Sequence, residues 1–309
     1  MRIAAVVHYY LPVHRAGAEV MLHGLLQPLV ARGHMVEVWA TDQDGEFTVD
    51  GVTVHGGRPD LVDADVVVSH LKEVPAARVL ARRARARLVQ VLHSDAPWIA
   101  RDVARGASLY VANTHWVAGR LRPRMHAPHL VVHPPVWPER HRTVPGDAVT
   151  LVNPLPEKGA GLFYELAERL PDAPFLVVEG GYRRHEQIRR NNLSNVTWQS
   201  ATADMRLDVW ARTRVLLMPS EFESYGLVAV EAAASGIPTI ATRTEGLLEA
   251  LGDAGTWAAP GDIDLWEKAL RTVLGPGWAA ASARARARAD SLETQKELSA
   301  WVEAVESLS

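Results

Sequence analysis

The segment RVLLMPSEFESYGLVAVEAAASG, residues 214–236, predicts a strand, a loop and a helix in succession. RVLLM is a continuous apolar run, typical of a parallel strand that is buried on both faces. The helix begins with LVAV, and Gly236 and Pro238 are signals for its end. The loop carries Glu223, and the helix carries Glu231 among leucine, valine and alanine. A strand followed by a helix in this way indicates a parallel α/β sheet.

The same alternation runs through the whole chain in two series, which a proline-rich segment at 133–147 separates. We therefore predict two Rossmann-like parallel-sheet domains, at 1–140 and 141–290, followed by a C-terminal helix at 291–309. From about residue 262 the pattern is helical, and we expect the ARARARA run at 283–289 to form a polar helix face. The predicted strands are 2–7, 35–40, 64–69, 88–93, 108–113 and 130–133 in the first series, and 148–153, 175–181, 195–199, 214–220 and 237–241 in the second. Helical patterns at 17–33 and 75–88 lie between strands of the first series.

Composition excludes several classes of protein. The 309 residues are 48% hydrophobic, and 33 basic against 36 acidic residues give a net charge of -3, so no nucleic-acid partner is expected. The chain has no cysteine, which excludes disulfides and thiolate nucleophiles and fits a cytoplasmic protein. The apolar runs are too short for a membrane span or a signal peptide. The arginine-rich segment 82–87 leaves a peripheral membrane contact open.

Glu223 and Glu231 are the candidate binding residues of the opening segment. Ligands of open α/β sheets bind beyond the carboxyl ends of the strands, where Glu223 falls. A carboxylate buried in an apolar helix needs partners, and the two hydroxyls of a ribose would suit Glu231. Gly226 allows close backbone approach, and the start of the helix favours phosphate. The alternative is that both acids are solvated at a surface.

The segment PSEFESYGLVAVEAAASGIPTIAT, residues 219–242, resembles the E-x7-E region of retaining, GT-B-fold glycosyltransferases of the family 4 type, the glycosyl transferases group 1. The resemblance continues through residues 7–42, 131–136, 153–181 and 249–270. It implies two Rossmann-like domains that face a central cleft, with the acceptor in the first and a nucleotide-sugar donor in the second. It also implies a hexosyltransferase-like enzyme that transfers a sugar with retention and without a metal.

The resemblance assigns roles to individual residues. Glu231 is expected to hold the ribose of the donor and Glu223 to lie near the hydroxyls of the donor sugar. Lys158 is expected to neutralise the diphosphate, and His93 to point at the donor sugar as a catalytic-site residue. Other expected donor contacts are Gly17, Asn153 and the backbone at Tyr225, Gly226, Leu227 and Val228.

The chain departs from the family pattern at several positions. Asn153 stands where an arginine is common, so stabilisation of the leaving group rests more on Lys158, on helix N-termini or on Arg243. Ala16 precedes Gly17 where the family often has a second glycine. Glu245 and Leu248 replace a usual glycine and proline. Tyr9, Tyr10, His14 and Trp98, expected on loops of the first half, are candidate acceptor contacts.

Metal binding is not expected. Asp-x-Asp occurs at 42–44, 63–65 and 262–264, but so short a motif is common without a metal. Motifs of P-loop, HExxH zinc and GxGxxG dinucleotide proteins are absent from the sequence. Two alternatives remain: a sugar-nucleotide epimerase or phosphorylase of the same fold, and a sugar-nucleotide-binding protein without transfer activity. The acceptor, whether a small molecule or a glycan, and the oligomeric state stay open.

Overall fold

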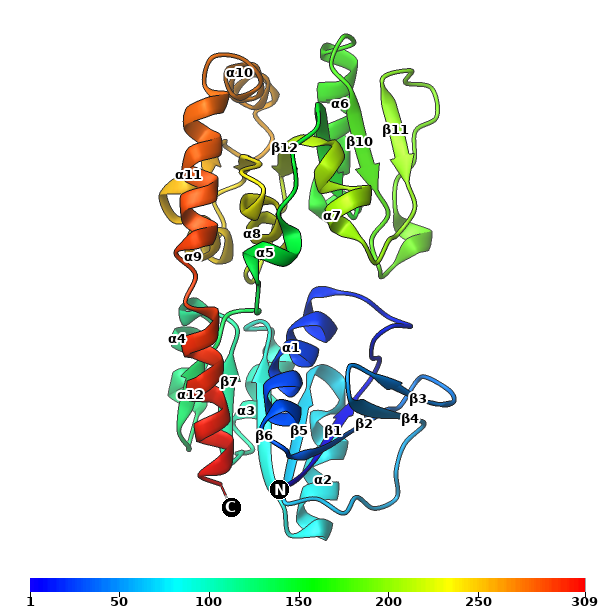
Figure 1. Ribbon diagram of the computed structural model, residues 1–309, viewed down its shortest axis with the longest axis vertical. Coiled ribbons are helices and arrows are strands. Elements are labelled where there is room, and N and C mark those ends of the chain that lie inside the picture. Colours follow the sequence, from blue (N-terminus) through cyan, green and yellow to red (C-terminus); the bar gives the residue numbers. More distant parts are fainter. Residues whose placement is uncertain (309) are drawn as a thin grey trace. The chain divides into compact units, whose positions relative to one another are not determined.

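A computed structural model describes residues 1–308 and divides the chain into two units (Figure 1). Unit 1 comprises Met1–Pro135 together with the C-terminal segment that starts at Glu293, and unit 2 comprises Val136–Leu292. Each unit is an α/β domain built on its own sheet, as predicted. In the part of the chain that the structure describes, no helix combines the length and apolarity needed to cross a membrane.

Unit 1 contains an eight-stranded sheet in the order β3-β4-β2-β1-β5-β6-β7-β8. All pairs are parallel except β3–β4, an antiparallel hairpin that the sequence analysis missed because both strands are short and β3 is largely exposed. The strand order reverses between β1 and β5. The strands are β1 (Arg2–Val7), β2 (Met35–Ala40), β3 (Glu46–Val49), β4 (Val52–Gly56), β5 (Val66–His70), β6 (Arg87–Leu92), β7 (Leu109–Ala112) and β8 (His129–Val131).

Five α-helices belong to unit 1: α1 (Gly17–Ala31), α2 (Val74–Ala84), α3 (Pro97–Val103), α4 (His115–Leu121) and α12 (Thr294–Glu306). The last of them, α12, packs on α1, far from it in sequence. Trp301 is fully buried and donates its indole N–H to the carbonyl of Leu25 at 2.7 Å. Arg32 donates to the carboxylate of Glu306 at 3.1 Å. The C-terminal helix is therefore part of the first domain's core.

Unit 2 contains a six-stranded parallel sheet in the order β11-β10-β9-β12-β13-β14. Successive residues of β12 face opposite sides of it: Val215 and Leu217 belong to one apolar cluster, and Leu216 and Met218 to the other. The strands are β9 (Ala148–Val152), β10 (Phe175–Val178), β11 (Val196–Gln199), β12 (Thr213–Met218), β13 (Thr239–Ala241) and β14 (Thr256–Trp257). The α-helices are α5 (Pro138–His141), α6 (Ala160–Arg169), α7 (Met205–Asp208), α8 (Leu227–Ala234), α9 (Glu245–Leu251), α10 (Ile263–Leu274) and α11 (Trp278–Asp290).

The alternating arginines and alanines of α11 do more than form a polar surface. Ala285 and Ala289 are buried in one cluster with alanines of α8. Arg286 donates to the carbonyl of Ser235 at the end of α8 at 3.3 Å, and Arg288 donates to the carbonyl of Ala250 in α9 at 2.7 Å. These arginines satisfy carbonyls that helix ends leave unpaired, and so hold α8 and α9 in place.

Candidate donor-binding site

The candidate site of unit 2 lies at the carboxyl ends of β9 and β12. The chain runs outward from β9 to β10 and β11 on one side, and from β12 to β13 and β14 on the other. The adjacent strands β9 and β12 therefore form the switch point of the sheet, which is where open α/β sheets bind ligands. The loop after β9 carries Asn153 and Lys158, and the loop after β12 carries Glu223.

These two loops are packed against each other. Gly159 has a φ of +80°, and a Cβ atom on it would lie 2.3 Å from Cγ of Pro219. The backbone N–H of Glu221 donates to the carbonyl of Glu157 at 2.9 Å. A glycine is needed here because a side chain would push the loops apart. This contact fixes the short helix of Pro156–Lys158 beside residues 219–223.

Lys158 and Glu223 form an ion pair at this point. Lys158 Nζ donates to Oε1 of Glu223 at 2.6 Å, and the hydroxyl of Ser220 donates to the same oxygen at 3.0 Å. Both charged side chains are less than one-fifth exposed. Burial alone lowers the pKa of Lys158, but the charge of Glu223, with a smaller contribution from Tyr182, outweighs it and raises that pKa. Lys158 is therefore a firmly charged cation at the switch point.

The helix after this loop, α8, begins at a backbone geometry that only glycine adopts easily. Gly226 is the N-cap, with φ +99° and ψ 51°, and a Cβ atom on it would lie 2.5 Å from Cδ2 of Leu247. Gly226 and Tyr225 are buried, and Leu227 and Val228 open the helix half-buried. Gly226 has no side chain to cap the first N–H groups of α8. The N-terminus of this helix is therefore suited to an anion.

Glu231 follows just over one turn into α8. It is only 9% exposed, so the burial predicted from its apolar neighbours is confirmed. Glu231 and Glu223 reach the same end of the sheet from one continuous segment, because the loop and the helix both follow β12.

Asn153 occupies the arginine position of the family pattern in a constrained conformation. It has a positive φ of 61° and is 7% exposed. Its side chain packs so closely on Gly180 that a Cβ atom there would lie 2.4 Å from Cγ of Asn153. A neutral amide is thus built tightly into the start of the loop after β9, and the nearby candidate base Arg243 is exposed.

In unit 1, His93 and Gly17 likewise come after the carboxyl ends of strands: His93 directly follows β6, and Gly17 begins the helix that follows β1. Gly17 is the first residue of α1, and a Cβ atom there would meet nothing within 4 Å, so the space beside it is open. His93 follows β6 and is nine-tenths buried, with Nε2 2.9 Å from Nδ1 of His70. Burial lowers the pKa of His93 to about 4, so its imidazole is neutral at neutral pH.

The candidate acceptor residues divide into two groups. Tyr9 stacks on His14 with ring centroids 4.8 Å apart, and Trp98, 38% exposed, lies on α3 rather than on a loop. Tyr10 does not fit the expectation. It is fully buried, and its hydroxyl lies 2.7 Å from Nδ1 of His23. Its apolar ring packs into the core because a histidine satisfies the hydroxyl there, so Tyr10 is not available at the surface.

Two polar residues of this region were given no role in the sequence analysis. Glu19, in the first turn of α1, is 4% exposed and has Oε2 3.4 Å from Nδ1 of His14. His70 ends β5 and is fully buried. A signal existed for both: Glu19 follows Gly17 by two positions, and His70 falls at the carboxyl end of a predicted strand.

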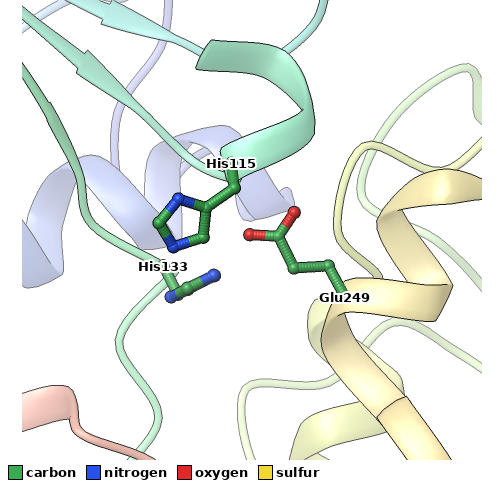
Figure 2. Close-up of side chains that lie close together, drawn as sticks. All are labelled: His115, His133 and Glu249. Atoms are coloured by element: carbon green, nitrogen blue, oxygen red, sulfur yellow. The ribbon is translucent and has the colours of Figure 1, made fainter. Parts of the chain in front are cut away.

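A further histidine pair of unit 1 lies at the ends of β7 and β8. The rings of His115 and His133 lie edge to face, with centroids 5.8 Å apart and an interplanar angle of 63° (Figure 2). His133 donates its backbone N–H to Oε2 of Glu297 at 2.8 Å, and its ring Nδ1 lies 2.8 Å from the other oxygen of that carboxylate. Burial raises the pKa of Glu297, but the hydrogen bond and charge of His133 outweigh it and lower that pKa. The contacts of His133 with Glu297 thus join the start of α12 to the segment that follows β8.

The three Asp-x-Asp segments have structural contacts of their own. Asp65 accepts from the backbone N–H of Arg2 at 2.7 Å, and Asp42 lies 3.1 Å from Nδ1 of His8. Asp262 caps α10 by accepting from the N–H of Leu265 at 3.1 Å. In each segment, at least one carboxylate therefore has a contact within the protein.

The two α/β units and the switch-point site define a protein of the GT-B class, and comparison with solved structures confirms this fold. The structure of HepE from Anabaena in complex with UDP and glucose superposes with a TM-score of 0.80 at 19% identity, over 98% of this chain and 99% of that one. The sucrose-phosphate synthase of Thermosynechococcus elongatus gives a TM-score of 0.78 at 15% identity, over 100% of this chain and 98% of the other.

Sequence comparison points to the same class of protein. Residues 146–275, less than half of the chain, match the family model described as Glycosyl transferases group 1. The sulfoquinovosyl transferase SQD2 of Arabidopsis thaliana is 30% identical over 124 residues, which are 38% of this chain and 24% of that protein. The chain thus spans about a quarter of the length of this curated relative. Residues 146–275 are therefore similar to the group 1 glycosyltransferases.

Proposed function

We propose that this protein is a retaining glycosyltransferase that moves a sugar from a nucleotide-diphosphate donor to an acceptor hydroxyl, without a metal. The observation that carries the proposal is the buried Lys158–Glu223 pair, which lies at the switch point beside the start of α8. A fixed cation and the N-terminus of a helix together suit a diphosphate, and carboxylates suit sugar hydroxyls. UDP-glucose is the first donor to test, because HepE was crystallised with UDP and glucose.

In the proposed reaction, Lys158 and the N–H groups of Leu227 and Val228 stabilise the negative charge that develops on the departing diphosphate. Glu231 accepts from the two ribose hydroxyls, and Glu223 accepts from hydroxyls of the donor sugar. Departure of the phosphate and attack of the acceptor on the same face retain the configuration, so no enzymic nucleophile is required. Catalysis then comes from positioning and from electrostatic stabilisation.

The first experiment is a thermal-shift screen with UDP, GDP, ADP and dTDP sugars, since a ligand of the native state raises its unfolding temperature. The stabilising donor is then incubated with and without a panel of acceptors, and the anomeric configuration of any product is read by proton NMR. We expect acceptor-dependent transfer with retention. An inverted product would overturn the proposed stereochemistry but not the transfer itself.

The same experiment separates the alternatives. An epimerase turns over the donor with no acceptor, and a phosphorylase needs inorganic phosphate in place of the acceptor. Asn153 in the arginine position motivates the non-catalytic alternative, because it removes one cation from the site. Tight donor binding without turnover across the acceptor panel would favour a binding protein.

Removal of Glu231 tests the ribose contact. We expect Glu231→Ala to weaken nucleotide binding at least about tenfold, because hydrogen bonds to a charged group contribute about 1.5–3 kcal/mol each. Isothermal titration with the nucleoside diphosphate measures the affinity. Glu168→Ala, at an exposed acid near the end of α6, is the matched control. Equal affinity in a folded Glu231→Ala protein would show that the ribose binds elsewhere.

A further inference from the structure

His70 and His93 form a histidine pair, and their surroundings decide which of the two donates the hydrogen bond between them. The two nitrogens that meet, Nδ1 of His70 and Nε2 of His93, are 2.9 Å apart. His70 is fully buried, and burial lowers the pKa values of both residues, that of His70 well below its ordinary range. Both rings are therefore neutral at neutral pH, and each carries one proton. One nitrogen of the contact must donate and the other must accept.

The outer nitrogen of His70 favours one of the two directions. Nε2 of His70 is buried and has no hydrogen-bond partner within residues 1–308. If His93 donated to His70, the proton of His70 would be on this nitrogen as a buried N–H without an acceptor. If His70 donates, the same atom holds only a lone pair. Buried N–H groups without partners are the rarer defect in proteins, which favours His70 as the donor.

The other nitrogen of His93, Nδ1, carries the proton when His70 is the donor. The negative charge of Glu19 acts to raise the pKa of His93, although burial outweighs it. Nδ1 of His93 makes no hydrogen bond to the described residues. This atom is also not completely buried, so it remains accessible.

We propose that His70 is a positioning residue: its Nδ1–H donates to Nε2 of His93 and fixes His93 as the Nδ1–H tautomer. The accessible Nδ1 of His93 is then a neutral hydrogen-bond donor. The catalytic consequence rests on the proposed transfer function. His93 donates to a hydroxyl oxygen of the bound sugar and does not remove a proton, because its basic nitrogen is occupied by His70.

The tautomers are measured directly by long-range 1H–15N NMR on protein labelled with 15N-histidine at pH 7. We expect His93 to be protonated at Nδ1 and His70 at Nδ1. His70→Asn keeps an N–H donor at the position of Nδ1 and should preserve the His93 tautomer, whereas His70→Leu removes the donor and should release it. Protonation of His93 at Nε2 in the native protein would overturn the proposal. An unchanged His93 tautomer in a folded His70→Leu protein would overturn it too.

Kinetics of the same variants test the consequence for transfer. We expect His70→Leu to lower kcat by on the order of 10²-fold, with little change in KM for the nucleotide sugar, and His70→Asn to restore most of the rate. His185→Asn, at an exposed histidine of unit 2, is the control. A full rate in His70→Leu with a changed tautomer would remove the catalytic role of His70. Absence of transfer in the native protein would count against the proposed function instead, and the NMR result would still decide the tautomer.

Discussion

Lys158 keeps its charge because Glu223 lies beside it, and Glu223 tolerates burial for the same reason. We expect Lys158→Ala to lower kcat by about 10²-fold, the usual effect of losing one group that stabilises a transition-state oxyanion. The unfolding free energy should also fall by about 1–3 kcal/mol, because Glu223 is left buried without its cation. Transfer rates and urea unfolding measure the two effects.

The double variant Lys158→Ala/Glu223→Ala separates these effects. It should regain stability but not activity, since it removes the unpaired carboxylate along with the cation. Lys268→Ala, at an exposed lysine of α10, should change neither quantity. Because the pKa of Lys158 is raised above its ordinary value, the side chain is charged at neutral pH and loses its proton only in strongly alkaline solution. Unchanged transfer in Lys158→Ala would move the diphosphate site elsewhere.

At the scale of single residues, the sequence predicted those that pattern and position could define. The burial of Glu231 followed from its apolar helix, and the location of Lys158 and Glu223 followed from their places after predicted strands. Tyr10 could not be placed, because its burial depends on a hydrogen bond to His23 that comes from a distant turn of α1. The partners of His93 were missed for the same reason: tertiary contacts, not local pattern, bring His70 and Glu19 to it.

At the scale of elements, the start of α8 depends on Gly226. An alanine there would be held at φ +99° and would press its Cβ on Leu247. We expect Gly226→Ala to destabilise the protein by about 1–2 kcal/mol and to weaken nucleotide binding, because the first N–H groups of the helix must shift. Chemical unfolding and titration calorimetry give the two values.

Gly161→Ala is the matched control for this substitution. Gly161 lies in α6 with no atom within 4 Å of an added Cβ, so alanine should stabilise that helix by about 0.5–1 kcal/mol and leave binding intact. Nucleotide affinity that is equal in Gly226→Ala and the native protein would show that the start of α8 does not contact the ligand.

The predicted elements differ from the observed ones where packing overrides local pattern. The strands with continuous apolar runs were located within a few residues, since burial on both faces makes them distinct. The β3–β4 hairpin was missed because its strands are short and lie at the edge of the sheet, and because β3 has only exposed and half-buried residues. The arginines of α11 look solvated in sequence, and only the structure shows that they bind the ends of α8 and α9.

At the scale of the whole molecule, the C-terminal segment of the chain belongs to the first domain. The sequence analysis gave the C-terminal helix as a separate segment, whereas in the structure it belongs to the same unit as residues 1–135. Trp301, buried on α1, accounts for this grouping. The apolar pattern within α12 does not indicate which helix it packs on, because both units contain helices with apolar residues.

Acid should destabilise unit 1 before unit 2. Burial lowers the pKa values of His8, His23, His70 and His93, all in unit 1. Their folded pKa values lie below the unfolded value of 6.5, so the unfolded state binds protons first as the pH falls. The stability of unit 1 is therefore complete above pH 6.5 and declines toward pH 4.

At pH 5 the loss from His93 alone should be about 2 kcal/mol, and His70 should add to it in the same direction. Hydrogen exchange at pH 7 and pH 5, corrected for the intrinsic rate, resolves the two units by peptide. In unit 2, the pKa of Lys158 is raised and the pKa values of Glu186 and Glu267 are lowered, so these groups do not titrate between pH 5 and pH 7. Protection in unit 2 should therefore change little, and His70→Asn should reduce the pH dependence of unit 1. An equal loss of protection in both units would show that the buried histidines do not control the response.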